Sequence, residues 1–508
     1  MIDLTLERLR ADGQAFTEDI SRESYLAHSG HKAAAEFTPI YDRYADVLGE
    51  EALDLTVELF KGTADGTEEH RSAGMLLEWQ LESQASRSLA ELDERETEWE
   101  SSAIITTTEG RQLQYQAAAI EIANEKDRAQ RLMLDDARSE LVEREHAPLR
   151  LERLQREKEY IESLGLATDY NAAFEEITGV SLGKLAVDCA AFLRDTQAMW
   201  DETLPRHLRK SLGIKPGEAT RADALALLRA SEYDGGFPGG MLQGSVARQL
   251  REMNIDPSAG GRIIYDVAER PGKRARAFCA PTRVPEEVYL VLRRHGGQND
   301  YAALLHESGH ALHFANVRDD YPFEYRWLGD NSVTESYAML FDHRMQDRGW
   351  LLRYTELGKG NIEDFLRLAG FEEIHYIRRY CAKLIYEVEA YGTRGDWNAL
   401  PDLYVDTLTN ATTFQYKRAD AFVDFDARYY STRYLRAWQL QALLSECLVE
   451  QFDQDWYRNP AAGPWMIGEL WSEGQRETAE EIAARIRVGS DPLSFAPLIR
   501  NIEKLLAG

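Results

Sequence analysis

Two histidines and a glutamate in the middle of the chain have the spacing of a catalytic zinc site. Residues 304–313 read LLHESGHALH, so His306, Glu307 and His310 form the pattern H-E-x-x-H. On a helix the two histidines project from one face about one turn apart, and neutral ring nitrogens bind zinc. Glu307, about 100° around the helix, can hold a water beside the metal. The pattern predicts zinc-dependent hydrolysis. A metzincin would have a histidine where this chain has Asn316, so that class is excluded.

A catalytic zinc needs a third protein ligand, and the sequence favours Glu335 for this role. This glutamate stands in the run NSVTESYAMLFD at 331–342, which has the apolar pattern of a helix. Either Asn331 or Ser332 can cap that helix. A carboxylate on such an apolar helix needs a partner, and a zinc ion provides one.

Two aspartates lie near Glu335. Asp330 precedes the expected helix and is the weaker candidate ligand, because a turn or cap role accounts for it. Asp342 follows Glu335 by seven residues, about two turns, and so shares its face of the helix. Asp342 could accept the second ring N–H of a zinc histidine, as metal sites usually require, or it could lie on the surface at the helix end.

The elements before the zinc helix are predicted to be mostly helices. Residues 1–175 have the pattern of long antiparallel helices, and 113–137 reads as helical throughout. The β-branched run at 103–107 is the exception, and it predicts a short strand or one arm of a hairpin.

A small sheet and then more helices are expected in the rest of the chain. Three short apolar runs could be strands, although the third could also be one turn of a buried helix: 263–267, 276–280 and 288–292. Asn299 or Asp300 can cap the zinc helix, and the pattern beyond residue 298 is helical to the end.

Composition excludes several classes of protein. The 508 residues are 44% hydrophobic and carry a formal net charge of −28, which argues against binding to nucleic acid or anionic membranes. The four cysteines lie far apart without a C-x-x-C pair, so neither a cysteine-rich zinc module nor a disulfide framework is expected. The first residues are charged where a signal peptide is apolar, and no apolar stretch reaches the roughly 20 residues of a membrane span. We expect a soluble cytoplasmic protein that does not bind membranes.

The motif and its spacing resemble those of the thimet oligopeptidase and oligoendopeptidase F family of zinc peptidases. In that family H-E-x-G-H-A-x-H is followed at the same distance by a glutamate ligand, as Glu335 follows His310 by 25 residues here. Residues 124–131 (NEKDRAQR) are similar to a D-R-x-x-R stretch of the family's amino-terminal lobe. The resemblance is strong over about 260–345 and loose before residue 175.

The resemblance implies a fold as well as a class of substrate. That fold is mainly α, a two-lobed helical metallopeptidase with a deep substrate channel and a small β-sheet near the zinc helix. Residues 1–175 would form a helical N-terminal lobe and 176–508 the zinc-peptidase catalytic region. The implied substrates are short unstructured peptides.

The family also carries a histidine followed by clustered tyrosines that reach over the zinc. No histidine follows His375 here, but Tyr430 and Tyr434 are present and would share one face of a helix. The resemblance implies that one of these hydroxyls donates a hydrogen bond to the developing oxyanion. What the missing histidine contributes in the family is either absent here or supplied by Arg428, Arg433 or a tyrosine. For each tyrosine the alternative is a place in the aromatic core.

The sequence therefore predicts a metallopeptidase that binds one zinc ion through His306, His310 and Glu335 and uses Glu307 as general base. Two alternatives stay open. One is a peptide-binding protein with a structural or inactive zinc site, although the intact Glu307 argues against it. The other is a zinc hydrolase of a different amide or ester. Sequence preference, endo- or exo-cleavage and oligomeric state are not determined.

Overall fold

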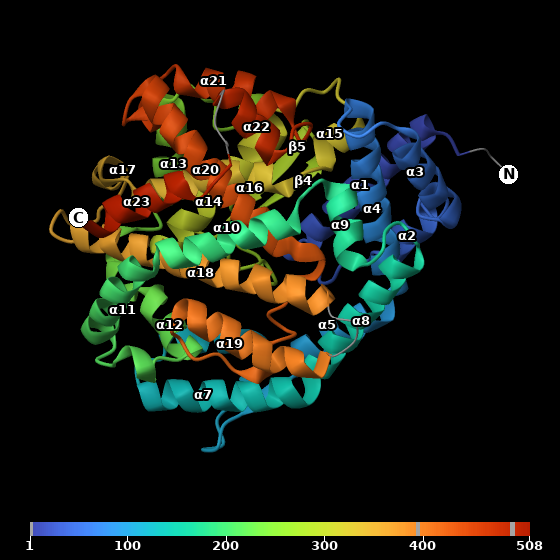
Figure 1. Ribbon diagram of the computed structural model, residues 1–508. Helices are drawn as coiled ribbons and strands as arrows, with labels where there is room; N and C mark the ends of the chain where they lie inside the picture. The colour runs from blue at the N-terminus through green and yellow to red at the C-terminus, as the bar shows by residue number, and fades with distance from the viewer. Residues whose placement is uncertain (1–3, 393–396, 488–492, 508) are drawn as a thin grey trace.

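The computed structural model describes residues 4–392, 397–487 and 493–507 and is mainly helical, with two small sheets (Figure 1). The helices that precede the larger sheet are α1 (Leu6–His28), α2 (Thr38–Arg43), α3 (Glu50–Gly62), α4 (Glu68–Ser88), α5 (Ala90–Ser102), α6 (Ala118–Asn124), α7 (Arg128–Leu141), α8 (Ala147–Ser163), α9 (Tyr170–Thr178), α10 (Leu182–Asp195), α11 (Gln197–Ser211), α12 (Arg221–Arg229) and α13 (Leu242–Glu252). Those that follow it are α14 (Gln298–Ala315), α15 (Phe323–Trp327), α16 (Asn331–Asp342), α17 (Arg348–Tyr354), α18 (Ile362–Gly392), α19 (Leu400–Thr412), α20 (Tyr430–Phe452), α21 (Ala462–Glu469), α22 (Ala479–Ile486) and α23 (Ala496–Ala507). The mainly-α fold class expected from the sequence is confirmed.

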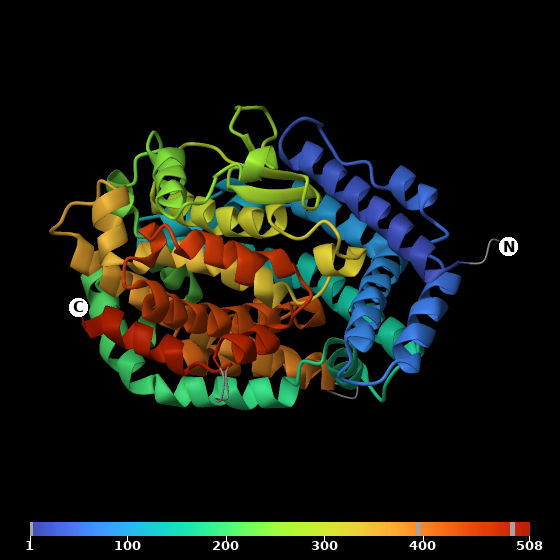
Figure 2. The same ribbon diagram turned by 90° about the horizontal axis from the view of Figure 1, so that it is seen from above.

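The three apolar runs before the zinc helix are all strands, which settles the third run as β rather than helix. They are β3 (Ile263–Asp266), β4 (Phe278–Arg283) and β5 (Glu287–Val291). The sheet order is β3-β5-β4, with β3 parallel to β5 and β4 antiparallel to it. This sheet packs on α14, and Figure 2 shows the strands lying beside that helix.

The N-terminal region contains the predicted hairpin but not one continuous helix over 113–137. Strand β1 (Ile104–Thr106) pairs antiparallel with β2 (Gln112–Gln114). The helical expectation for 113–137 is wrong, because the stretch is divided between β2, α6 and α7. Asp127 causes the second break, since its carboxylate accepts hydrogen bonds from the amides of Ala129 and Gln130 and caps α7.

The D-R-x-x-R stretch ties two helices together. The guanidinium of Arg128 donates to both carboxylate oxygens of Asp223 at 2.9–3.2 Å, and Arg131 donates to Asp223 Oδ1 at 2.7 Å. Asp223 belongs to α12 and is fully buried. The motif therefore has a structural role here, joining α7 to α12.

The largest hydrophobic core draws side chains from Leu53 to Leu505, and so from both predicted regions of the chain. The boundary predicted between residues 175 and 176 and the deep channel stay predictions. Among the described residues, no helix is both long enough and apolar enough to cross a membrane.

Candidate metal centre

Helix α14 presents the H-E-x-x-H residues, and its start differs from the one predicted. Gly297, with φ of 91°, is the N-terminal cap residue, and no side chain caps the helix. Asp300 lies inside the first turn and accepts a hydrogen bond from the amide of Gly296 at 2.9 Å. The expectation of a cap at Asn299 or Asp300 is therefore wrong, because the left-handed glycines turn the chain into the helix earlier.

A glycine in the motif lets the two site helices approach closely. A Cβ atom on Gly309 would lie 2.5 Å from Cα of Ala338 and 2.6 Å from the carbonyl oxygen of Tyr337, both in α16. Only a residue without a side chain fits there. The close contact brings the face of α14 that carries the histidines against the face of α16 that carries Glu335.

The three predicted ligands come together in the structure. Nε2 of His306 lies 3.4 Å and Nε2 of His310 3.8 Å from Oε2 of Glu335. One potential ligand atom from each residue falls within 4.8 Å of the others. The two imidazole rings are nearly perpendicular, at 83°, with centroids 4.9 Å apart.

The donor set fits a metal ion. Oε2 of Glu335 is buried and has no hydrogen-bond partner, although unsatisfied buried carboxylate oxygens are costly. The same oxygen is the atom that both imidazole Nε2 atoms face. Two nitrogens and one carboxylate oxygen form a typical three-residue ligand set for catalytic zinc.

The outer nitrogen of each imidazole is already engaged. Nδ1 of His306 donates to Oδ2 of Asp342 at 2.8 Å, and Nδ1 of His310 lies 2.8 Å from Oγ1 of Thr334. Such partners fix the ring tautomer and leave Nε2 free for a metal. Asp342 thus occupies the outer position considered for it from the helical spacing, whereas no feature of the sequence pointed to Thr334.

The charges of the three candidate ligands and their partners favour the binding of a cation. Burial lowers the pKa of His310, so its ring is neutral, as a ligand must be. Burial also opposes the charge on His306, but Asp342 and Glu335 outweigh it and raise that pKa to about 10. Burial raises the pKa of Glu335, yet the two histidines outweigh this effect and lower it. A bound metal ion would replace the proton that these carboxylates otherwise attract to His306.

The carboxylate of Glu307 contacts the sheet. Its Oε2 accepts a hydrogen bond from the backbone amide of Cys279 in β4 at 2.8 Å. The carboxylate is half-buried and is not part of the ligand group. An edge strand therefore orients the predicted general base.

The two predicted tyrosines flank Glu335 from α20. The hydroxyl of Tyr430 donates to Oε1 of Glu335 across 3.4 Å, and the ring of Tyr434 lies 5.2 Å from that of Tyr430. Tyr434 also packs edge-on against Tyr380 of α18, at 5.4 Å. Tyr430 is thus beside the ligand cluster, while Tyr434 belongs to an aromatic group next to it.

Two residues in left-handed conformation place Tyr430 at the start of α20. Arg428 and Tyr429 have φ values of 55° and 50°, which side chains seldom adopt. Nε of Arg428 lies 3.2 Å from Oε1 of Glu157 in α8, and the Tyr429 hydroxyl donates to Asn171 in α9. Contacts with N-terminal helices therefore hold the turn that presents Tyr430.

Asp330 has the capping role that the sequence analysis considered as the alternative to metal binding. It caps α16 by accepting a hydrogen bond from the amide of Ser332 at 3.0 Å, and Arg436 donates to both its oxygens at 2.9 and 2.6 Å. The cap expected at Asn331 or Ser332 is therefore wrong by one or two positions.

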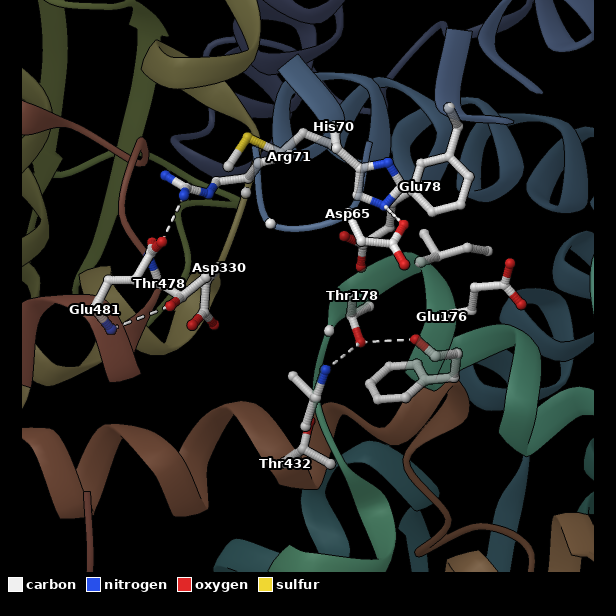
Figure 3. Close-up of a pocket in the computed structure, with 18 of the residues that line it drawn as sticks. Asp65, His70, Arg71, Glu78, Glu176, Thr178, Asp330, Thr432, Thr478 and Glu481 are labelled. Atoms are coloured by element: carbon white, nitrogen blue, oxygen red, sulfur yellow. Dashed lines mark hydrogen bonds and ion pairs between the residues drawn. The ribbon is translucent and has the colours of Figure 1, made fainter. Parts of the chain in front are cut away.

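A cavity of about 500 Å³ lies between α4, α9, α20 and α22 (Figure 3). Arg433 lines it, and its guanidinium stacks on the Tyr430 ring at 5.1 Å, so the cavity adjoins the ligand cluster. Each arginine that lines this cavity is paired with a carboxylate: Arg71 with Glu481 at 2.5 Å, Arg433 with Glu78 at 2.9 Å and Arg436 with Asp330 at 2.6 Å.

A second group with metal-binding atoms, Glu96, Glu100 and His146, is less suited to a cation. Nε2 of His146 is hydrogen-bonded to Oε1 of Glu96 at 2.8 Å. Arg150 lies 3.3 Å from the other oxygen of Glu96 and already provides a positive charge. These residues form a paired network rather than an open ligand set.

Comparison with solved structures shows the fold that carries this site. No protein-family model and no curated protein sequence matches the chain. A carboxypeptidase from Pyrococcus furiosus is 14% identical with a TM-score of 0.65, and 98% of each chain is covered. An M32 carboxypeptidase from Deinococcus radiodurans is 13% identical with a TM-score of 0.60. Metallocarboxypeptidase 1 from Trypanosoma cruzi is 12% identical with a TM-score of 0.62. In both comparisons 99% of each chain is covered.

These similarities extend over the whole chain, and at such low identity they show a common fold alone. The fold is therefore one also found in metallocarboxypeptidases. The finer resemblance to the thimet oligopeptidase and oligoendopeptidase F family stays a prediction.

Proposed function

We propose that the protein is a zinc-dependent peptidase. The observation that carries the proposal is the orphaned Oε2 of Glu335, which faces Nε2 of both His306 and His310. A shared fold with metallocarboxypeptidases supports it. His306, His310 and Glu335 would hold one zinc ion, which supplies Lewis-acid activation of water and of the scissile carbonyl.

The side chains around the ligands would carry the proton transfers. Glu307, oriented by the amide of Cys279, takes a proton from the attacking water and delivers it to the leaving amine nitrogen. Tyr430, beside Glu335, donates a hydrogen bond to the oxyanion that develops on the scissile carbonyl. Asp342 and Thr334 keep the two imidazoles in the orientation that ligands need.

Peptides are the proposed substrates, and removal of C-terminal residues is the favoured mode of cleavage. This mode is favoured because solved structures with the same fold are of carboxypeptidases. The earlier alternatives, an inactive peptide-binding protein and a hydrolase of another amide or ester, are outcomes that the test separates.

Mass spectrometry of digested peptides tests the proposal. The zinc-loaded protein is incubated with a peptide mixture that contains each sequence with a free carboxyl terminus and with an amidated one. We expect stepwise loss of C-terminal residues from the free peptides, little reaction with the amidated ones, and none after chelation. Equal internal cleavage of both forms would contradict the carboxypeptidase mode. Binding without cleavage of any peptide would contradict peptidase function.

A further inference from the structure

A separate cavity of about 540 Å³ lies behind the predicted metal centre, between α20, α23 and the turn that follows α16. His343 lines it, and this residue is hydrogen-bonded to Asp342, the partner of His306. None of the three predicted ligands lines the cavity. It is therefore distinct from the site described above.

Arg344 lines this cavity, and part of its guanidinium forms no hydrogen bond. The residue is only 5% exposed, and its guanidinium stacks on Trp456 at 4.6 Å. Nε donates to the carbonyl of Leu340 at 3.1 Å, but neither Nη1 nor Nη2 donates a hydrogen bond to any described residue. The nearest carboxylate, Asp347, is 4.0 Å away and already caps α17. Burial outweighs Asp347 and lowers the pKa of Arg344, which indicates an incompletely compensated charge.

Two further side chains line the cavity without a partner. Gln441 of α20 is 3% exposed, and its amide makes no hydrogen bond within the described part of the chain. Lys504 of α23 is exposed and forms no ion pair with any described residue. The free polar atoms of Gln441 and Arg344 are open to the cavity, where they can donate hydrogen bonds to a ligand.

The remaining charges at the rim neutralise one another. Glu446 accepts from Arg487 at 3.0 Å and from Arg500 at 2.6 Å, and Arg487 also donates to Glu450 at 3.0 Å. Arg344 and Lys504 are therefore the cations of the cavity that form no hydrogen bond to a carboxylate among the described residues, in a chain whose net charge is −28. Such donors select oxygen anions, with which they form charge-assisted hydrogen bonds.

We propose that this cavity binds a small oxyanion, a phosphate or a carboxylate, through Arg344, Gln441 and Lys504. Titration calorimetry on the zinc-loaded protein tests the proposal, with inorganic phosphate in one series and succinate in the other, at fixed ionic strength. Saturable binding of phosphate but not succinate, or of succinate but not phosphate, shows which class of oxyanion the cavity binds. We expect one such site per chain in addition to any anion that binds at the metal.

Cavity variants assign the binding to these residues. Gln441→Leu removes the unpaired amide but keeps the side-chain volume, and Lys504→Met removes the charge but keeps the chain length. Each should weaken anion binding about tenfold, the loss typical of one hydrogen bond to a charged group. Lys126→Met, which removes an exposed lysine in the loop between α6 and α7, is the control for overall charge.

The outcomes are distinguishable. Anion binding at the metal would persist unchanged in all three variants, so its presence does not hide a loss at the cavity. Equal affinity in the wild type, Gln441→Leu and Lys504→Met overturns the proposal for both anions. An equal loss in Lys126→Met and Lys504→Met also overturns it, because the effect would then be general electrostatics.

Discussion

His343 donates from Nδ1 to Oδ1 of Asp342 across 2.5 Å, while the other oxygen of this carboxylate lies 2.8 Å from Nδ1 of His306. Nε2 of His343 is 2.9 Å from Oε1 of Glu373 in α18. Burial opposes the charge on His343, but Glu373 and Asp342 outweigh it and raise that pKa to about 10. Burial likewise opposes the charge on Asp342, but His343 and His306 lower that pKa to about 2. An imidazolium between two carboxylates therefore keeps Asp342 ionised and aimed at His306.

Replacing His343 by Leu should lower zinc affinity about tenfold to a hundredfold, because Asp342 then loses the partner that orients it. Competition with a chromogenic chelator measures the affinity. Glu373→Gln is the matched variant, since it keeps an oxygen acceptor for His343, and we expect less than about a threefold change. Thermal melts must show that both variants are folded. Unchanged zinc affinity in folded His343→Leu would show that the histidine merely fills space.

Replacing Glu307 by Gln should abolish most turnover and leave zinc binding intact. The amide cannot accept the proton of the attacking water, and general-base catalysis typically contributes about 10²–10⁴ in rate. Zinc content by elemental analysis and peptide hydrolysis by mass spectrometry are the two measurements. Near-normal hydrolysis in this variant would eliminate Glu307 as the base.

Glu335→Ala should impair zinc binding, whereas Asp330→Ala should impair stability. The first removes a proposed ligand, so zinc affinity and activity should fall together. The second removes the α16 cap and one of the two carboxylates that pair with Arg436, which keeps Glu480, so we expect a loss of about 1–2 kcal/mol of stability. Zinc affinity of the folded Asp330→Ala fraction should be near normal. The reverse pattern would identify Asp330 as the ligand.

Tyr430→Phe should lower kcat about 10²–10³-fold with little change in KM, because a hydroxyl that meets the oxyanion acts mainly in the transition state. Tyr434→Phe tests the second candidate with the same chemical change. The position of Tyr430 beside Glu335 leads us to expect the larger effect there. A variant that loses roughly 1 kcal/mol of stability but keeps kcat has lost only a structural hydrogen bond.

Gly309→Ala should destabilise the protein by about 3 kcal/mol and weaken zinc binding. The added Cβ would lie 2.5 Å from Cα of Ala338, so α14 and α16 must move apart. Gly244→Ala in α13 is the control, because a Cβ there meets nothing within 4 Å. That variant should gain about 0.5–1 kcal/mol from its better helix propensity. Chemical denaturation gives both values, and equal stabilities would contradict this account of the helix contact.

The sequence alone determined the features that depend on local pattern. The H-E-x-x-H residues, the apolar helix carrying Glu335, a strand near residue 105 and the first two strands before α14 all follow from periodicity and residue type over short segments. The third run before α14 fitted a strand or a helical turn equally, and the structure decided for the strand. Local chemistry also explains two failures of this reasoning. Asp127 caps a new helix, α7, inside the stretch 113–137, and positive-φ glycines start α14 before the expected cap.

Tertiary structure decided which distant residues meet. Thr334 contacts His310, the Cys279 amide holds Glu307, and His343 pairs with Glu373, although nothing in their sequence context marks these partners. Each contact depends on how closely two elements approach, and in one case that distance is set by the missing side chain of Gly309. Helix periodicity specifies the face of a residue, whereas only packing specifies what that face touches.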